Sequence, residues 1–377
     1  MPSTIGNALK VTVFGQSHSA AVGCVVEGLP AGFRVDTEAL AAFMARRAPG
    51  KNAWSTPRRE ADEVRILSGL NPQGATCGAP LALMIENTNT RSGDYDNLVR
   101  MPRPGHADWV ANEKWNGNQD VPGGGHFSAR LTAPLCAAGA ICLQMLAERG
   151  VRVGAHLAEV AGIADEPFAA LGTDALSHHL LSLQLDALED GRAFPTISKE
   201  AGEAMQEAIE DARAVQDSVG GVVECVVIGL PVGIGSPMFD GMENLVARAA
   251  FGIPAVKGVE FGRGFEAARM RGSEHNDPYR MVDGLVAPSK NDAGGILGGI
   301  TTGAPLLFRM ALKPTSSIGI PQPSVDLAEG KDALLTVEGR HDPCVAPRAV
   351  PVAEAIAAIA VLDAWLSFPP QQSGQLR

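Results

Sequence analysis

The sequence of 377 residues predicts an α+β fold made of two similar halves. Two blocks recur in the same order along the chain: residues 24–32 return as residues 225–233, and residues 76–81 return as residues 301–306. The first pair of blocks shares seven of nine residues. Because self-similarity of this kind reports repeated supersecondary units, we expect one pseudo-symmetric unit rather than two independent domains.

The elements of each half follow from local composition. A short strand is expected at residues 11–14, and the Cys-Val-Val segments of the first repeat block are expected as buried strands that end in Leu-Pro-x-Gly turns. Helices rich in small residues are expected at residues 134–149 and 351–366. With 43 glycines and 26 prolines, much of the remaining backbone is expected in turns, where glycine lets a ligand approach the main chain.

An acidic segment separates the two halves. Between Asp165 and Ala212 there are eleven acidic and two basic residues, so this segment carries most of the net charge of −11. Part of it is predicted to be an amphipathic helix with a solvated outer face, because apolar residues recur at helical spacing: Ala201, Met205, Ile209, Ala212 and Val215. The expected organisation is a single domain over residues 1–366, with repeat halves at about 1–150 and 220–366, the acidic segment at 165–212 and a flexible tail at 367–377.

Composition excludes several classes of protein. A hydrophobic share of 45% and a charged share of 19% exclude a disordered chain, and six cysteines without a Cys-x-x-Cys pair indicate reduced thiols. The longest uninterrupted apolar run, residues 133–143, is shorter than the roughly 18 residues that span a bilayer, and residues 1–10 lack the apolar core of a secretory signal. The negative charge argues against nucleic-acid binding. We therefore expect a cytoplasmic protein without a membrane or nucleic-acid partner.

Basic residues nevertheless gather on predicted loops. Five of them fall within fourteen positions: Arg46, Arg47, Lys51, Arg58 and Arg59. Others lie in turns or glycine-flanked stretches: Arg103, Arg130 and Arg340. A single arginine on irregular backbone is usually only solvated, but several together favour a polyanionic small molecule, because guanidinium binds phosphate and carboxylate oxygens bidentately.

Two histidines are candidates for proton transfer near neutral pH. His18 lies in Gly-Gln-Ser-His-Ser at residues 15–19, directly after the first strand, and His106 lies in Arg-Pro-Gly-His-Ala-Asp at residues 103–108. Either histidine alone is more often structural. Both are expected on tight turns, where a fixed imidazole can be presented to a ligand.

Three other chemistries fit the sequence poorly. A hydrolase triad around Ser17 fails because Ser19 stands where the nucleophile elbow needs glycine. Residues 262–267 match a dinucleotide fingerprint, but Gly272 breaks the helix that should follow. The sequence has no His-Glu-x-x-His motif and no well-spaced set of ligands, so no metal is expected.

Glycine-rich stretches supply possible anion sites. Residues 123–130 read Gly-Gly-Gly-His-Phe-Ser-Ala-Arg, and residues 294–299 lead to Lys-Pro-Thr-Ser-Ser at residues 313–317. Exposed backbone N–H groups, a lysine and three hydroxyl residues suit the phosphate end of a cofactor. Residues 339–344 place Arg340 near Asp342, just before the final helix.

On these motifs the chain resembles the chorismate synthase family from residue 5 to the final helix; the most specific stretches are residues 103–108, 256–260, 294–299 with 313–317, and 339–351. The resemblance implies a β-α-β sandwich with helices between antiparallel sheets and an internal pseudo-twofold repeat, in a homotetramer. It also implies a lyase of the shikimate pathway. In this reaction, 5-enolpyruvylshikimate-3-phosphate loses phosphate and a ring hydrogen by trans-1,4-elimination to give chorismate, with reduced FMN (FMNH2) required and no net redox change.

The resemblance also implies roles for individual residues. His18 would protonate the departing phosphate, His106 would protonate the reduced flavin, and Ser17 with Asp342 would form a short proton relay. The positions that match flavin contacts of the family are His126, Phe127, Ser128, Ala255, Gly298, Lys313, Pro314, Thr315, Ser316, Ser317 and Arg340. Those that match its substrate-binding arginines are Arg46, Arg47, Arg58, Arg103 and Arg130.

The sequence departs from the family pattern at several positions. Gln16 replaces a glutamate and so removes a negative charge near the first histidine, His126 replaces an arginine, Pro254 replaces an asparagine, and Ala48 and Ala53 stand where arginines are common. Two alternatives therefore remain open. One is a flavin reductase that uses NADPH, as in family members that reduce their own flavin, and the other is a flavin-binding scaffold without activity.

Overall fold

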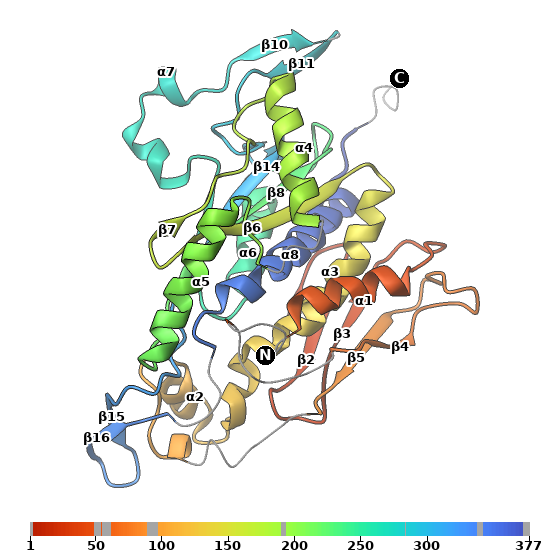
Figure 1. The fold of residues 1–377 in the computed structure, drawn as a ribbon. Helices are drawn as coiled ribbons and strands as arrows, with labels where there is room; N and C mark the ends of the chain where they lie inside the picture. The colour runs from red at the N-terminus through yellow and green to blue at the C-terminus, as the bar shows by residue number, and fades with distance from the viewer. Residues whose placement is uncertain are drawn as a thin grey trace.

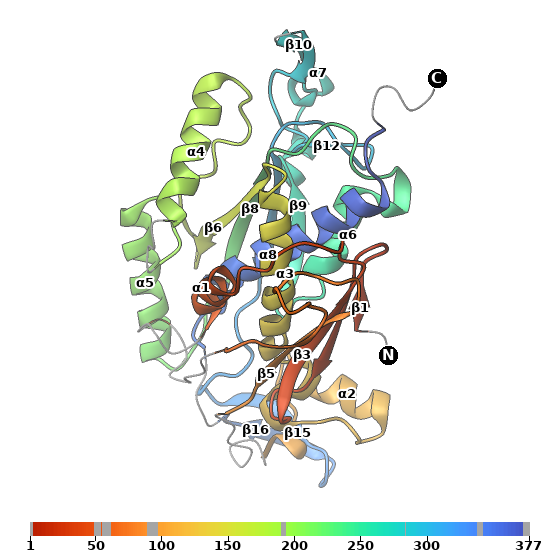
Figure 2. The same ribbon diagram turned by 90° about the vertical axis from the view of Figure 1, so that its right-hand side faces the viewer.

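Two five-stranded antiparallel sheets enclose a layer of helices (Figures 1 and 2). The structure is a computed structural model that describes residues 3–48, 54, 62–88, 97–189, 194–282, 284–337 and 342–371. The first sheet has the order β1-β2-β3-β5-β4, with the bounds Thr4–Ile5, Lys10–Gly15, Ala21–Glu27, Leu81–Glu86 and Arg65–Ser68. The second has the order β7-β6-β8-β14-β9, with the bounds Ile163–Ala164, Arg152–Val160, Gly221–Ile228, Leu306–Leu312 and Val256–Phe261.

The two sheets repeat one topology. In the first half the chain passes through β2, β3, α1 (Thr37–Arg47), β4, β5 and α3 (Thr132–Ala147), and in the second half through β6, β8, α6 (Met242–Ala250), β9, β14 and α8 (Ala346–Ser367). The Cys-Val-Val blocks form the central strands β3 and β8, which pair with β5 and β14. The predicted α+β fold with an internal repeat is therefore confirmed.

Helices α3 and α8 cross in the middle layer and are buried on nearly all sides, as expected for helices that are apolar around their circumference. Small residues allow their close approach: a Cβ atom added to Gly139 would lie 2.4 Å from the Cβ atom of Ala355. The final helix begins at Ala346, five residues before the predicted start at Pro351. Pro347 occupies the first turn, where no N–H partner is needed, and Pro351 is accommodated inside the helix.

The middle layer contains two segments long and apolar enough to span a membrane, residues 129–147 and Ala346–Ser367. The longest uninterrupted apolar run within them is residues 133–143, so run length alone does not reveal either segment. In the structure, 78% and 89% of the residues in their most apolar windows are buried within the protein, which is the environment of core helices.

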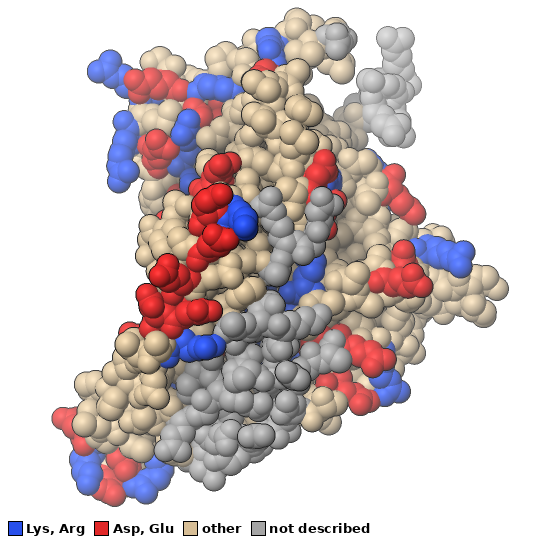
Figure 3. All heavy atoms as spheres, viewed as in Figure 1, with Lys and Arg blue, Asp and Glu red and all other residues tan. Residues whose placement is uncertain are grey.

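The acidic segment forms α4 (Ala175–Glu189) and α5 (Lys199–Ala214), which lie against the second sheet. Ser198 is the N-cap of helix α5: its side chain accepts a hydrogen bond from the N–H group of Ala201. It buries Met205 and Ile209, as predicted, and its acidic side chains face outward over this helix in Figure 3.

The remaining elements are short. They are the helices α2 (Asp108–Trp115) and α7 (Gly272–His275), the 3-10 turns η2 (Pro122–Phe127), η3 (Ala129–Leu131), η4 (Met238–Asp240) and η5 (Gly264–Arg269), and three hairpins. The hairpins are β10–β11 (Tyr279–Val282 and Leu285–Pro288), β12–β13 (Ile296–Leu297 and Ile300–Thr301) and β15–β16 (Gln322–Asp326 and Lys331–Leu335). Helix α2 and the β15–β16 hairpin lie at one end of the sandwich and β12 at the other (Figure 2).

Candidate active site

The triple-glycine loop brings the two predicted histidines together. Gly123, Gly124 and Gly125 in η2 have φ angles of 62°, 83° and 52°, a left-handed conformation that glycine adopts without steric cost. A Cβ atom added to Gly123 would lie 2.4 Å from Nδ1 of His18, and one added to Gly124 would lie 3.3 Å from Nε2 of His106. The two imidazoles therefore lie against consecutive residues of one loop.

Ser17 shares this loop contact. Its N–H group donates to the carbonyl of Gly125 over 3.1 Å, and its side chain is buried. The Ser17 Oγ atom has no hydrogen-bond partner among the described residues. A buried hydroxyl without a partner is costly, so a ligand atom at this point would be stabilising.

His106 is held by a buried ion pair. Its Nδ1 atom lies 2.6 Å from Oδ1 of Asp108, the first residue of α2, and the Asp108 carboxylate also binds Nε and Nη2 of Arg103 at 2.7 and 2.8 Å. Burial alone would raise the pKa of Asp108, but hydrogen bonds from Arg103 and His106 outweigh it and hold this pKa well below its usual range. Arg103, predicted to bind substrate, thus directs its guanidinium to Asp108 and, over 3.0 Å, to Ser317.

A second cluster of charged side chains is centred on Asp62. Asp62 is fully buried between two predicted arginines: it accepts a hydrogen bond of 2.6 Å from Arg47 and another from Arg130. Arg47 also donates to Thr132 Oγ1 and to the carbonyl of Ala129. Burial would raise the pKa of Asp62, but the two guanidinium groups lower it below its ordinary value. The arginines thus come from α1 and η3 to one carboxylate.

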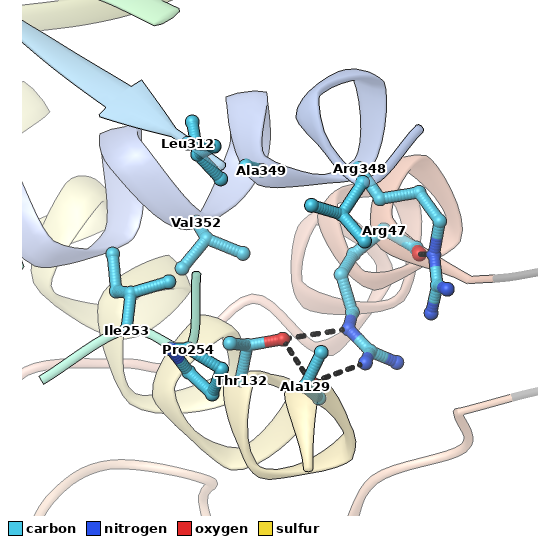
Figure 4. Close-up of a pocket in the computed structure, with 10 residues that line it drawn as sticks. Arg47, Ala129, Thr132, Ile253, Pro254, Leu312, Arg348, Ala349 and Val352 are labelled. Atoms are coloured by element: carbon cyan, nitrogen blue, oxygen red, sulfur yellow. Dashed lines mark hydrogen bonds between the residues drawn. The ribbon is translucent and has the colours of Figure 1, made fainter. Parts of the chain in front are cut away.

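A small cavity of about 30 Å³ adjoins this cluster and has Arg47 and Arg348 on its wall (Figure 4). Arg348 donates to Asp342 over 2.6 Å and contacts the carbonyl of Arg47. Arg348 was not among the predicted residues, although an arginine in the first turn of a mostly apolar helix was a usable signal. Asp342 therefore lies beside the arginine cluster. Within the described residues, Ser17 Oγ has no hydrogen-bond partner, so no hydrogen bond joins it to Asp342, and the relay between them stays a prediction.

The predicted phosphate loop packs against the turn that carries His106. Lys313 Nζ donates to Ser316 Oγ over 2.7 Å, and Ser316 donates to the carbonyl of Gly105 over 2.8 Å. Burial lowers the pKa of Lys313, and the positive charges of Lys257 and Arg103 lower it further. This crowding of positive charge at Lys313 favours an anionic ligand.

Two further flavin candidates adjoin this loop. The N–H group of Lys313 donates to the carbonyl of Ala255, which has a positive φ of 75°. Thr315 Oγ1, between Pro314 and Ser316, is buried without a hydrogen-bond partner in the described part of the chain. The loop thus offers a cation and an unsatisfied hydroxyl, and it contacts the turn that carries His106 through Ser316 and Gly105.

His126 and its neighbours extend the site toward the first sheet. The Nδ1 atom of His126 lies 3.2 Å from the carbonyl of Gly15, so it donates there, and Nε2 accepts from Ser3 Oγ over 3.0 Å. Phe127 packs against Trp115, and Ser128 caps η3 by accepting from the N–H group of Arg130. His126 and Pro254 also line a cavity of about 390 Å³ whose wall is mainly apolar.

Two of the described candidates, Arg46 and Gly298, do not join this group. The guanidinium of Arg46 is engaged at 2.6 and 2.7 Å by Glu354, a buried carboxylate of α8. Gly298 lies in the β12–β13 turn, near the start of β14, whereas Lys313 follows its end. Seven strand residues separate these ends by roughly 20 Å. Arg58 and Arg340 lie outside the described residues. Among the residues that the structure describes, no cluster of His, Cys, Asp or Glu could hold a metal ion.

Comparisons with known proteins agree with the fold and identify the family. A family model described as chorismate synthase matches residues 9–366. The chorismate synthase of Lancefieldella parvula is 46% identical over 99% of both chains, and that of Korarchaeum cryptofilum is 44% identical over 95% of this chain and 96% of its own. A crystal structure of chorismate synthase superposes with a TM-score of 0.72 at 27% identity and covers 96% of this chain and 93% of the other. The chain belongs to the chorismate synthase family.

Proposed function

We propose that this chain catalyses the chorismate synthase reaction, the trans-1,4-elimination of phosphate from 5-enolpyruvylshikimate-3-phosphate. The reaction breaks a C–O bond to phosphate and a ring C–H bond and forms a new C=C bond, with no net oxidation. The observation that carries the proposal is the meeting of His18 and His106 at Gly123 and Gly124. Asn87 ties this site to the buried arginine cluster, because it accepts a hydrogen bond from Arg130 and donates to the backbone carbonyls on either side of His18. Full-length similarity to chorismate synthases supports it.

The arginine cluster fits a polyanionic substrate. Among its described members, three guanidinium groups outnumber two carboxylates: Arg47, Arg130, Arg348, Asp62 and Asp342. A phosphate or carboxylate group would compensate this difference and bind through charge-assisted hydrogen bonds. We propose Arg47, Arg130 and Arg348 as the substrate-facing cations, together with Arg58. Arg46 and Arg103 instead hold other parts of the protein in place.

The residues present fit reduced FMN. Thr315 Oγ1 and Ser17 Oγ are buried atoms without partners among the described residues, and Lys313 is a crowded cation beside two further hydroxyl groups. Lys313 to Ser317 would hold the flavin together with Ala255, His126, Phe127, Ser128 and Arg340. When bound, the reduced flavin supplies the electron density that helps the phosphate leave, and recovers it when the ring hydrogen is lost.

The two histidines would manage the protons. His18 would hold the proton that the departing phosphate takes up, and His106 would present Nε2 toward the space beside Gly124, where it would protonate the reduced ring. Because both imidazoles lie against one loop, a single enclosed space would serve both transfers. Ser17 and Asp342 would form the short proton relay that the resemblance implies, and Asp342 would also hold Arg348, to which it is bound.

We further propose a cytoplasmic homotetramer. Exposed apolar side chains on the β10–β11 hairpin are consistent with contacts to other copies: Tyr279, Met281, Leu285 and Val286. If Gly298 contacts flavin as the resemblance implies, another copy of the chain must supply it, because one chain holds it at the far end of β14. Light scattering on the purified protein tests the assembly, and the mass of a monomer at working concentration would contradict it.

The reaction itself is tested without oxygen. Purified protein is mixed with FMN reduced by dithionite and with 5-enolpyruvylshikimate-3-phosphate, and phosphate and chorismate are measured together. We expect equal amounts of both products and no consumption of reduced flavin. Omission of dithionite while NADPH is supplied separates a self-sufficient enzyme from one that depends on reduced flavin from elsewhere. Tight binding of FMN without phosphate release would instead identify an inactive flavin-binding scaffold.

A further inference from the structure

Asp108 is bound on both carboxylate oxygens. Its Oδ2 atom accepts from the backbone N–H group of Arg103 over 3.0 Å and from Arg103 Nε over 2.7 Å, while Oδ1 lies 2.8 Å from Arg103 Nη2 and 2.6 Å from His106 Nδ1. The carboxylate is buried, and so is the arginine. This is a charge-assisted network with fixed geometry rather than a surface ion pair.

The network determines which nitrogen of His106 carries hydrogen. A carboxylate that is held ionised can only accept hydrogen bonds, and the short contact to Oδ1 therefore requires a hydrogen on Nδ1. Arg103 Nη2 lies 3.1 Å from the same nitrogen, but guanidinium also only donates, so its hydrogen is directed to the carboxylate. In the neutral imidazole, Nε2 is then left with its lone pair, on the side of Gly124.

We propose that Asp108 is a positioning residue that fixes His106 in the Nδ1–H tautomer, so that Nε2 is the atom that exchanges a proton with the ligand. This inference rests on the proposed function only for the identity of the ligand. The tautomer itself follows from the contacts of Asp108.

Arg103 links this unit to the second half of the chain. Its Nη1 atom donates to Ser317 over 3.0 Å, and Ser316 donates to the carbonyl of Gly105 over 2.8 Å. The turn of His106 is therefore bound to the loop that begins at Lys313, more than 200 residues later in the sequence. Arg103 thus orients Asp108 and joins the proton-transfer residue to the proposed flavin loop, which explains why its guanidinium is buried in protein contacts.

The tautomer is measured directly by NMR of the full-length protein with 15N-labelled histidine, with His106 assigned by comparison with His106→Asn. Above the pH at which His106 loses its charge, we expect the Nδ1–H form in the wild type. Asp108→Asn replaces an acceptor with an amide that can donate to Nδ1, so we expect a shift toward the Nε2–H form. An Nε2–H wild type, or an unchanged tautomer in a folded Asp108→Asn protein, would overturn the inference.

Kinetics supply a second readout. We expect Asp108→Asn to lower kcat at least about tenfold with a smaller change in KM, because the proton-transfer group is misoriented while the substrate cations remain. Glu113→Gln is the matched control, since it removes one carboxylate from the exposed face of the same helix. An equal loss in both variants would overturn the positioning role. If His106 shows the expected tautomer but His106→Ala retains full turnover, the proposed protonation role fails while the assignment of Asp108 stands.

Discussion

His18 and His106 are in contact with adjacent residues of one glycine loop, at Gly123 and Gly124, although they are distant in the sequence. The absence of side chains at these two positions allows both imidazoles to approach the same space. The space between the two imidazoles exists because neither glycine carries a side chain. Adding a single methyl group at either position therefore tests whether this space is needed.

Gly123→Ala and Gly124→Ala should lower turnover to different extents. The Cβ atom at Gly123 would lie 2.4 Å from both Ser17 Oγ and His18, so these side chains must move, whereas the one at Gly124 would lie 3.3 Å from His106 and needs a shift of only a few tenths of an ångström. We expect the larger loss of phosphate release from Gly123→Ala, measured under anaerobic conditions with reduced FMN.

Gly150→Ala separates this effect from backbone strain. Gly150 has a φ of 76° and no atom within 4 Å of an added Cβ atom, so the substitution strains the backbone without touching the site. We expect backbone strain to cost each of the three variants about 1–2 kcal/mol in the free energy of unfolding, with a further loss from the close contacts in Gly123→Ala, and normal turnover in Gly150→Ala only. Equal turnover in Gly123→Ala and Gly150→Ala would show that the contact with His18 is unimportant.

His106→Ala should slow turnover at least tenfold, since a positioned acid or base contributes about 10²–10⁴ in rate. The measurement is single-turnover formation of chorismate with reduced FMN. His178→Ala, at an exposed histidine of α4, serves as the control and should be indistinguishable from the wild type. Unchanged turnover in His106→Ala would exclude the proposed protonation of the flavin by this residue.

Asp62→Asn should destabilise the protein, because it leaves Arg47 and Arg130 buried without their shared counter-charge. Removal of one partner from a buried ion pair costs about 3–5 kcal/mol. We expect a loss of this size in urea unfolding at pH 7, and partial recovery in phosphate, which can take the place of the carboxylate. Glu63→Gln, an adjacent exposed carboxylate, should show neither effect.

The same ion pair predicts the pH dependence of that difference. The pKa of Asp62 is lower in the folded chain than in the unfolded chain. The stabilisation that the ionised Asp62 contributes is therefore complete above the unfolded pKa of about 3.8, and it is lost as the pH falls through the folded pKa. The stability gap between the wild type and Asp62→Asn should therefore narrow in strong acid. A gap that does not change with pH, or a variant that phosphate stabilises no more than the wild type, would contradict the role assigned to this carboxylate.

Much of the fold could be predicted from the sequence because its elements depend on local patterns. The repeated Cys-Val-Val blocks became the central strands β3 and β8, and the spacing of Met205 and Ile209 placed α5 correctly. The start of α8 was wrong by five residues, because Pro351 is a typical first residue of a helix but here lies inside one.

The partners of charged residues could not be predicted in the same way. Arg46 and Arg103 lie in sequence surroundings that predict substrate-binding arginines. In the structure, however, Arg46 pairs with Glu354, 308 residues away, and Arg103 pairs with Asp108. The partner of Arg46 depends on how α1 packs against α8 and not on local spacing. Arg103 and Asp108 lie in one motif, but the sequence alone does not show that this pairing occupies Arg103 in place of a substrate. The position of Gly298 could not be predicted either. Its motif matches the family, but the fold places it at the opposite end of β14 from Lys313.

Only one of the six thiols should react in the native protein. All six cysteines are free; Cys77 is exposed and the other five are buried. Burial raises the pKa of Cys24, Cys136 and Cys344 to about 12, and those of Cys142 and Cys225 are also raised, so the reactive thiolate is scarce in each. A thiol reagent such as DTNB should titrate one group before and six after denaturation. Labelling that persists in native Cys77→Ser would contradict this assignment.

His156 gives the second sheet a pH-dependent contact. It is buried between two carboxylates, with Nδ1 2.9 Å from Asp165 and Nε2 3.1 Å from Glu224. Burial alone would lower the pKa of His156, but hydrogen bonds to the two carboxylates outweigh it and raise this pKa. Asp165 in turn accepts from the N–H groups of Ile197 and Ser198, which precede α5. The charged imidazole therefore joins β6 and β8 to the acidic segment.

Because the folded pKa of His156 is raised, its stabilising contribution is complete below the unfolded value of about 6.5 and is lost as pH rises through the folded value. We expect His156→Gln to destabilise the chain most at pH 6, where two buried carboxylates lose their cation, and progressively less toward alkaline pH. Urea unfolding of both proteins across this range measures the difference. His179→Gln, on the exposed surface of α4, should show no such trend. A constant gap between the wild type and His156→Gln would mean that His156 acts by packing alone, because only the charged form responds to pH.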